Sequence, residues 1–197
     1  TRDHHQGWAR WYSNDNGATW SEPQYIDEEF VYSKFDKSAY GPIRGWFIGS
    51  GKICQSTKTK VNKYRRLYLV GSSCRQGSNE TANWVLYSDD FGETWEFLGG
   101  CDVSPMPNGD EPKAEELPDG SVLLSSRCNG GRRFNIFTFT DTKKAEGSWG
   151  EVAFSGQSNN GVTALNNACN GEVMLVPVTR KKDNQKMFLL LQSVPFG

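Results

Sequence analysis

The sequence predicts an all-β protein, and three observations narrow this prediction to a β-propeller. Short apolar segments recur at intervals of roughly ten residues, with glycine, asparagine and aspartate between them. No segment shows sustained helical periodicity. An eight-residue motif that begins at Ser13 returns at Ser88, 75 residues later. A motif repeated at long period indicates a repeated structural unit, which favours a propeller over a sandwich or a barrel.

The repeated motif is Ser-x-Asp-x-Gly-x-Thr-Trp, and each copy follows an apolar strand candidate. Its serine and aspartate side chains can bond nearby backbone N–H groups, and its glycine tolerates a positive φ. We expect each copy to form the tight corner of a β-hairpin, with the aspartate in a structural role and the tryptophan wedged between neighbouring sheets. The residues are Ser13, Asp15, Gly17, Thr19 and Trp20 in the first copy, and Ser88, Asp90, Gly92, Thr94 and Trp95 in the second.

A third, degenerate copy is expected in residues 140–149, which follow an apolar segment and end in Ser148-Trp149. It starts about 52 residues after the second copy, a spacing that holds four short strands and fits one propeller blade. At about 50–75 residues per blade the chain supplies three to three and a half blades, whereas propellers close with about 4–8. We therefore expect residues 1–197 to be one partial propeller domain, truncated at both ends.

The strand candidates, taken in chain order, are short runs of β-branched, aromatic and other apolar residues. Those of the first half are Trp8–Tyr12, Gln24–Ile26, Trp46–Ile48, Lys52–Gln55, Leu67–Val70, Asn83–Tyr87 and Glu96–Leu98. Those of the second half are Lys113–Leu117, Val122–Arg127, Asn135–Thr140, Val152–Phe154, Gly161–Leu165, Val173–Val178 and Met187–Gln192. Turn sequences such as Pro118-Asp119-Gly120 and Asn170-Gly171 separate them.

Composition argues against several classes of function. The chain has 22 Lys and Arg against 23 Asp and Glu, and this balance gives no basis for binding nucleic acid. Its longest apolar run, Met187–Leu191, is far shorter than the roughly 20 residues that cross a bilayer, so no membrane-spanning segment is expected. The five cysteines include no Cys-x-x-Cys pair, which argues against a metal site. No cofactor is implied.

The two complete motifs resemble the Asp-box, or bacterial neuraminidase repeat, and a longer segment makes the resemblance more specific. Glu111 is followed by Glu-Leu-Pro-Asp-Gly, an apolar strand and, sixteen positions after Glu111, by Arg127. This order is similar to a segment of bacterial-type sialidases, which are glycoside hydrolase family 33-like. Residues 47–53 resemble the Gly-Pro-Gly-x-Gly-Ile stretch of these enzymes, from which Ser50 and the residue order after Gly51 depart. Residues 189–195 resemble the strand that leads to the third active-site arginine of the family.

The resemblance implies the middle of a six-bladed propeller and the activity of a retaining exo-α-sialidase. Family members use an arginine triad, an acidic aspartate, a glutamate and a nucleophilic tyrosine. Two of these positions map onto this chain: Glu111 onto the glutamate that activates the tyrosine, and Arg127 onto the second arginine. The other groups would lie outside the chain, so the isolated chain is expected to be inactive. The implied partners are a sialylated glycan and the rest of the propeller, and the implied location is secreted, periplasmic or cell-surface.

The chemistry of sialic acid explains these residue types. Its anomeric carbon carries a carboxylate, which the planar guanidinium of Arg127 would bind with paired, charge-assisted hydrogen bonds. A neutral tyrosine avoids the repulsion that an attacking carboxylate would meet, but its pKa of about 10 requires a base such as Glu111. Each assignment has an alternative, a solvated loop carboxylate for Glu111 and a surface arginine for Arg127. Arg44 and Trp46 are weaker candidates for sugar contacts, with core packing as their alternative.

Two other functions fit the same motifs. A catalytically inactive Asp-box propeller that acts as a carbohydrate-binding module or scaffold would carry the same boxes without the remaining catalytic groups. A trans-sialidase would carry the catalytic groups and pass the sugar to another glycan. Nothing within the 197 residues separates transfer from hydrolysis.

Overall fold

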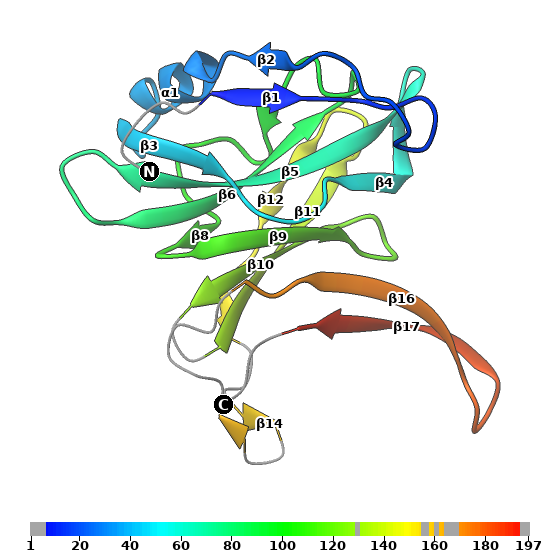
Figure 1. Cartoon of the computed structure of the whole chain (residues 1–197). Helices are drawn as coiled ribbons and strands as arrows, with labels where there is room; N and C mark the ends of the chain where they lie inside the picture. Colours follow the sequence, from blue (N-terminus) through cyan, green and yellow to red (C-terminus); the bar gives the residue numbers. More distant parts are fainter. Residues whose placement is uncertain (1–6, 129–130, 155–157, 160–161, 164–169, 194–197) are drawn as a thin grey trace.

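The computed structural model describes residues 7–128, 131–154, 158–159, 162–163 and 170–193. This part of the chain forms antiparallel sheets and a single short helix. In Figure 1 the sheets follow one another across the molecule: an N-terminal hairpin with the helix, a six-stranded sheet, a five-stranded sheet and a C-terminal hairpin.

The N-terminal unit consists of strands β1 (Trp8–Arg10) and β2 (Gln24–Ile26) and helix α1 (Glu29–Asp36). The helix corrects the expectation that the chain contains none. It buries Val31, Tyr32 and Phe35 on one face, but with eight residues it is too short to produce a sustained period in the sequence. Tertiary packing of this apolar face, rather than intrinsic propensity, stabilises a helix of this length.

In the six-stranded sheet, two strands, β3 (Ile43–Ile48) and β4 (Cys54–Val61), pair with the same partner, β5 (Tyr64–Arg75). The other strands of this sheet are β6 (Thr81–Ser88), β7 (Glu96–Phe97) and β8 (Met106–Pro107). β3 pairs with the second half of β5 and β4 with its first half. The loop between them, residues 49–53, therefore lies along the side of β5 that is opposite β6.

The five-stranded sheet has the simple up-and-down order of a propeller blade. Its strands are β9 (Asp110–Glu116), β10 (Val122–Cys128), β11 (Gly131–Asp141), β12 (Glu146–Trp149) and β13 (Ala153–Phe154). Two hairpins follow, β14 (Ser158–Asn159) with β15 (Val162–Thr163) and β16 (Val173–Arg180) with β17 (Gln185–Gln192). Of the expected strand Gly161–Leu165, residues 161, 164 and 165 lie outside the described part.

Two apolar cores lie between these units and hold them together. The first lies between the six-stranded sheet, α1 and β1, and its aromatic rings meet largely edge to face. Trp95 of the second motif is buried in this core, as expected for a wedge between sheets. Trp20 differs from that expectation, because 64% of it is exposed in the described structure. The second core joins the six-stranded and five-stranded sheets.

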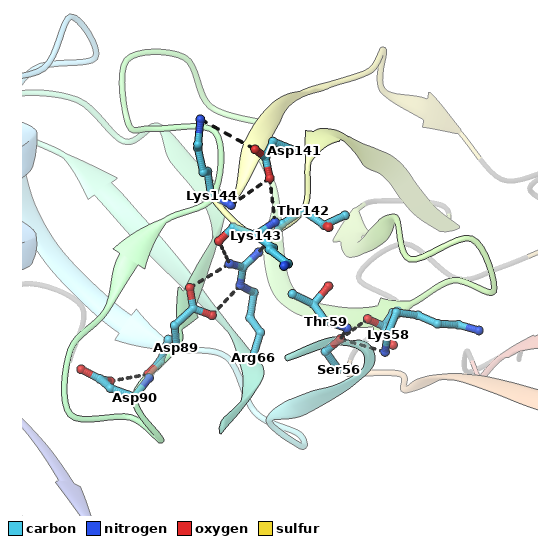
Figure 2. Close-up of polar contacts among 12 residues, drawn as sticks. Ser56, Lys58, Thr59, Arg66, Asp89, Asp90, Asp141, Thr142, Lys143 and Lys144 are labelled. Carbon is cyan, nitrogen blue, oxygen red and sulfur yellow. Dashed lines mark hydrogen bonds and ion pairs between the residues drawn. The ribbon is translucent and has the colours of Figure 1, made fainter. Parts of the chain in front are cut away.

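A buried arginine ties the two larger sheets together (Figure 2). Arg66 of β5 is fully buried, and its Nε and Nη2 donate to the two carboxylate oxygens of Asp89 at 2.7 and 2.8 Å. Its guanidinium also donates to the carbonyl oxygens of Thr142 and Lys143, in the turn between β11 and β12. This turn is where the degenerate third motif was expected. Its aspartate, Asp141, accepts the N–H groups of the next two lysines, without the serine and threonine bonds of the complete copies.

Candidate functional site

Glu111 and Arg127 meet at one end of the five-stranded sheet. Nη1 of Arg127 lies 3.3 Å from Oε2 of Glu111 and 3.7 Å from Oδ2 of Asp110. The side chains of Glu111 and Arg127 are 25% and 21% exposed, so this pair is accessible without being fully solvated. The structure thus brings together the two residues that the sequence analysis selected sixteen positions apart.

A β-bulge directs Glu111 toward Arg127. In the pairing of β9 with β10, Lys113 faces Ser125 and Asp110 faces Arg127, so Glu111 and Pro112 together face the single residue Ser126. Glu111 has a φ of 41°, a left-handed conformation that costs a residue other than glycine about 1–3 kcal/mol. Bulges occur next to active sites, where they re-aim a side chain. Proline is also tolerated at such a position because no ladder hydrogen bond is lost.

The segment before β16, residues 170–172, donates a backbone hydrogen bond to the Glu111 carboxylate. The backbone N–H of Asn170 donates to Glu111 Oε2 at 2.7 Å. The next two residues are fixed in turn, because Arg132 Nη2 donates to the carbonyl oxygen of Gly171 and the N–H of Ser193 donates to that of Glu172. The donor that meets Glu111 therefore belongs to a fixed backbone.

Two buried cationic residues of the site, Arg132 and Lys113, were not predicted from the sequence. Arg132 is the cross-strand partner of Arg127 and only 1% exposed; burial lowers its pKa, and the charge of Glu111 opposes that shift. Lys113 is 4% exposed, and burial lowers its pKa too, with Glu172 acting in the opposite sense. No simple sequence signal marks Lys113, because the bulge at Glu111 and Pro112 interrupts the alternation of β9.

The two weaker sugar-contact candidates have different outcomes. Trp46 is 0% exposed and packs against Trp8, Phe35 and Phe97, so the expectation of a sugar contact is corrected in favour of core packing. Arg44 lies on β3 and lines a shallow surface depression with residues 77–79. A role for Arg44 in sugar binding stays a prediction.

The two complete motifs form the same turn. In the first, Ser13 Oγ accepts the N–H of Gly17 at 2.8 Å and Asp15 accepts the N–H and hydroxyl of Thr19. In the second, Ser88, Gly92, Asp90 and Thr94 repeat these bonds. The hydrogen bonds from Thr19 and Ser13 lower the pKa of Asp15 to about 2. These bonds occupy both aspartates within their own turns, so the residues of the motifs serve the fold.

Within the described ranges, no group of three or more His, Cys, Asp or Glu side chains is arranged to hold a metal ion. No helix there has the length and apolar character needed to cross a membrane.

A family model and two curated proteins match this chain. The model of the BNR/Asp-box repeat matches residues 11–22 and 86–97, which contain the two complete motifs. A sialidase of Paraclostridium sordellii is 33% identical over 120 residues, which are 60% of this chain and 27% of that protein. Sialidase-3 of Rattus norvegicus is 28% identical over 134 residues, which are 66% of this chain and 30% of that protein. This chain therefore carries two BNR/Asp-box repeats and is similar to sialidases.

Solved structures carry the same fold. Trypanosoma rangeli sialidase in complex with the inhibitor DANA covers 93% of this chain with a TM-score of 0.56 and 16% identity. The complex of the same enzyme with 2,3-difluorosialic acid, described as a covalent intermediate, gives a TM-score of 0.55. In both cases the match takes up 27% of the longer chain. The predicted class, an all-β sialidase-like propeller, is confirmed, and the six-blade count stays a prediction.

Proposed function

We propose that the protein containing this chain is an exo-α-sialidase that releases terminal sialic acid from glycoconjugates with retention of configuration. The observation that carries the proposal is the pairing of Glu111 with Arg127 at a bulge of a sialidase-like sheet. The two sialidase relatives support the same reaction class. This chain spans less than a third of their length. We therefore propose that the remaining arginines, the acidic aspartate and the tyrosine lie outside residues 1–197.

Arg127 is suited to bind the substrate carboxylate. Its guanidinium ends a buried strand and is 21% exposed, so its outer N–H groups can meet a ligand while Glu111 and Asp110 hold the inner side. A planar guanidinium bonds a carboxylate through two parallel N–H groups, which fixes the sugar as well as attracting it.

Glu111 is suited to act as the base for a tyrosine nucleophile. Arg127 Nη1 lies 3.3 Å from its Oε2 and the Asn170 N–H donates to the same oxygen, so the carboxylate is held in one orientation. In the proposed first step Glu111 accepts the tyrosine proton, the tyrosine oxygen bonds the anomeric carbon, and an aspartate protonates the departing glycosidic oxygen. In the second step the aspartate takes a proton from water, the water oxygen replaces the tyrosine oxygen on the anomeric carbon, and Glu111 returns its proton to the tyrosine. The covalent intermediate described for Trypanosoma rangeli sialidase supports a two-step route.

Turnover of an aryl sialoside by the complete protein tests the proposal. Glu111→Gln should lower kcat by at least about a thousandfold, because the uncharged amide cannot accept the tyrosine proton. Glu115→Gln is the matched control: Glu115 lies on the same strand and pairs with Lys52 instead. Both variants should keep the circular dichroism and thermal unfolding of the parent protein. Wild-type turnover in Glu111→Gln would refute the role of Glu111, and an inactive parent protein that still binds sialylated glycan would favour the lectin or scaffold alternative.

Product analysis separates hydrolysis from transfer. The proposal expects free sialic acid even when lactose or another β-galactoside acceptor is present. Quantitative formation of sialylated acceptor would identify a trans-sialidase instead.

A further inference from the structure

Ser50 lies at the centre of a contact between three segments of the chain. It belongs to the loop that leaves the sheet between β3 and β4, at the position where this chain departs from the Gly-Pro-Gly-x-Gly-Ile pattern. Its hydroxyl accepts a hydrogen bond from Lys113 Nζ at 3.1 Å and donates one to Asn170 Oδ1 at 3.0 Å. A proline at this position could make neither bond.

The contact between Ser50 and Asn170 is one residue away from Glu111, the proposed base, because Asn170 also contacts Glu111. Asn170, whose side chain Ser50 holds, gives its backbone N–H to Oε2 of Glu111. The same oxygen faces Arg127 Nη1 at 3.3 Å. Two donors from different segments thus meet one carboxylate oxygen, and together they determine the orientation of the Glu111 carboxylate.

Lys113 determines the direction of the Ser50 hydroxyl. A serine hydroxyl has one proton to donate and two acceptor lone pairs. Because the ammonium group of Lys113 has no acceptor and is buried, it uses a lone pair of Ser50, and the single Ser50 proton remains for Asn170. There is little free space around the Lys113 ammonium group. A Cβ atom added at Gly51 would lie 3.1 Å from Lys113 Nζ and 2.9 Å from Glu172 Oε2.

We infer that Ser50 and Lys113 are positioning residues for Glu111, which act by fixing the Asn170 N–H against its carboxylate. Neither residue needs to contact the substrate. The inference rests on the proposed sialidase function, and it adds that a lysine and a serine of this chain determine how well Glu111 works as a base.

Lys113 also contributes charge to the same cluster. The other charged groups that face the cluster come from every neighbouring element: Asp110 and Glu111 from β9, Arg127 from β10, Arg132 from β11, Glu172 from the segment before β16, and the Lys52–Glu115 pair from the loop and β9. Removal of the Lys113 ammonium group therefore takes away both the hydrogen bond to Ser50 and one positive charge of this cluster.

The experiment compares four variants of the complete protein with an aryl sialoside as substrate. Ser50→Ala should lower kcat by about tenfold and change KM less than twofold, because a misplaced base slows the chemical step without weakening carboxylate binding. Ser50→Thr keeps a hydroxyl and should restore most of kcat. Lys113→Met should lower kcat to a similar extent, again with little change in KM. Lys34→Met, which removes a lysine paired with Glu96 of β7, should leave both constants unchanged.

The outcomes separate this inference from the proposed function. Wild-type kcat in both Ser50→Ala and Lys113→Met, with Glu111→Gln inactive, would overturn the positioning role and leave the sialidase proposal standing. Full activity of Glu111→Gln would instead overturn the proposed function itself. If Lys113→Met does not fold, the contrast between Ser50→Ala and Ser50→Thr decides the question, because a purely structural role would not split kcat from KM.

Discussion

Strand β9 carries a glutamate near each of its ends, and the structure treats the two in opposite ways. Glu116 is 5% exposed, and its carboxylate accepts hydrogen bonds from Ser56 Oγ and from the N–H and hydroxyl of Thr57. Glu111 is more accessible, lies in a bulge with a positive φ and faces an arginine that is itself partly exposed. The same end as Glu116 contains the fully buried Arg66, which pairs with Asp89, whose side chain is 26% exposed.

The comparison shows how a structural carboxylate differs from one that is available for chemistry. A structural carboxylate is fully buried and uses its oxygens on neutral donors that join two sheets. An available carboxylate keeps accessible surface, strain and an opposite charge that a ligand can engage. Substitutions at the Glu116 end should therefore change the free energy of unfolding, and substitutions at the Glu111 end should change the kinetics of catalysis.

The largest effect on stability is expected from Asp89→Ala. This change leaves the fully buried Arg66 guanidinium without its carboxylate, and the free energy of unfolding should fall by about 3 kcal/mol, as for other broken buried pairs. The exposed pair of Arg180 with Asp183 supplies the control, since Asp183→Ala should change the free energy of unfolding far less. Urea unfolding of the two variants measures the difference. Equal losses would show that burial does not distinguish the two pairs.

The next effect is kinetic and belongs to the other end. Arg127→Lys should lower kcat/KM by about 10- to 100-fold and raise KM, because an ammonium group cannot make the paired contact with a carboxylate. Arg65→Lys is the matched control, as Arg65 donates only to the carbonyl oxygens of Ser56 and Thr57. Steady-state kinetics would remove Arg127 from the site if both variants behaved alike.

Glycine and alanine at the two glutamate positions should rank in opposite orders. At position 111 the positive φ disfavours a Cβ, so Glu111→Gly should be more stable than Glu111→Ala by about 1 kcal/mol. Glu116 is not among the positive-φ residues of the described chain, so Glu116→Gly should be less stable than Glu116→Ala by about 0.5–1 kcal/mol. Chemical denaturation of all four variants tests the ranking. The same order at both positions would mean that the bulge stores no strain at Glu111.

The smallest effect concerns acid stability and the repeated motifs. The pKa of Asp15 is lowered from 3.8 to about 2 by the Thr19 and Ser13 bonds. The pKa of Asp90 is also lowered: burial raises it, but the bonds from Thr94 and Ser88 outweigh burial. A lowered folded-state pKa contributes stability that is complete above about pH 4 and is lost as the pH falls toward 2. The Asp15→Asn, Asp90→Asn double variant should show a shallower loss of melting temperature between pH 4 and pH 2, and an unchanged slope would contradict this assignment.

Sequence reasoning located the elements with strong local signals and missed those created by packing. The second strand and most hairpins agree with the expected ranges, since alternation and turn residues are local properties. Helix α1 was missed because its three buried residues gain stability only from the core that they contact. The Ser50–Lys113 contact was missed because it joins positions 63 residues apart, and no local pattern records such a pairing.

The sequence by itself determined the Asp-box turns, because the serine and aspartate hydrogen bonds that shape them run between residues of the same eight-residue motif. It also determined the class of the fold through the spacing of those turns. Only the tertiary structure decided that Trp95 is buried while Trp20 is exposed, and that Glu111 meets Arg127 while Glu116 meets Ser56. The physical reason is that burial and charge pairing depend on which distant segments arrive at the same place, and identical local sequences can have different neighbours.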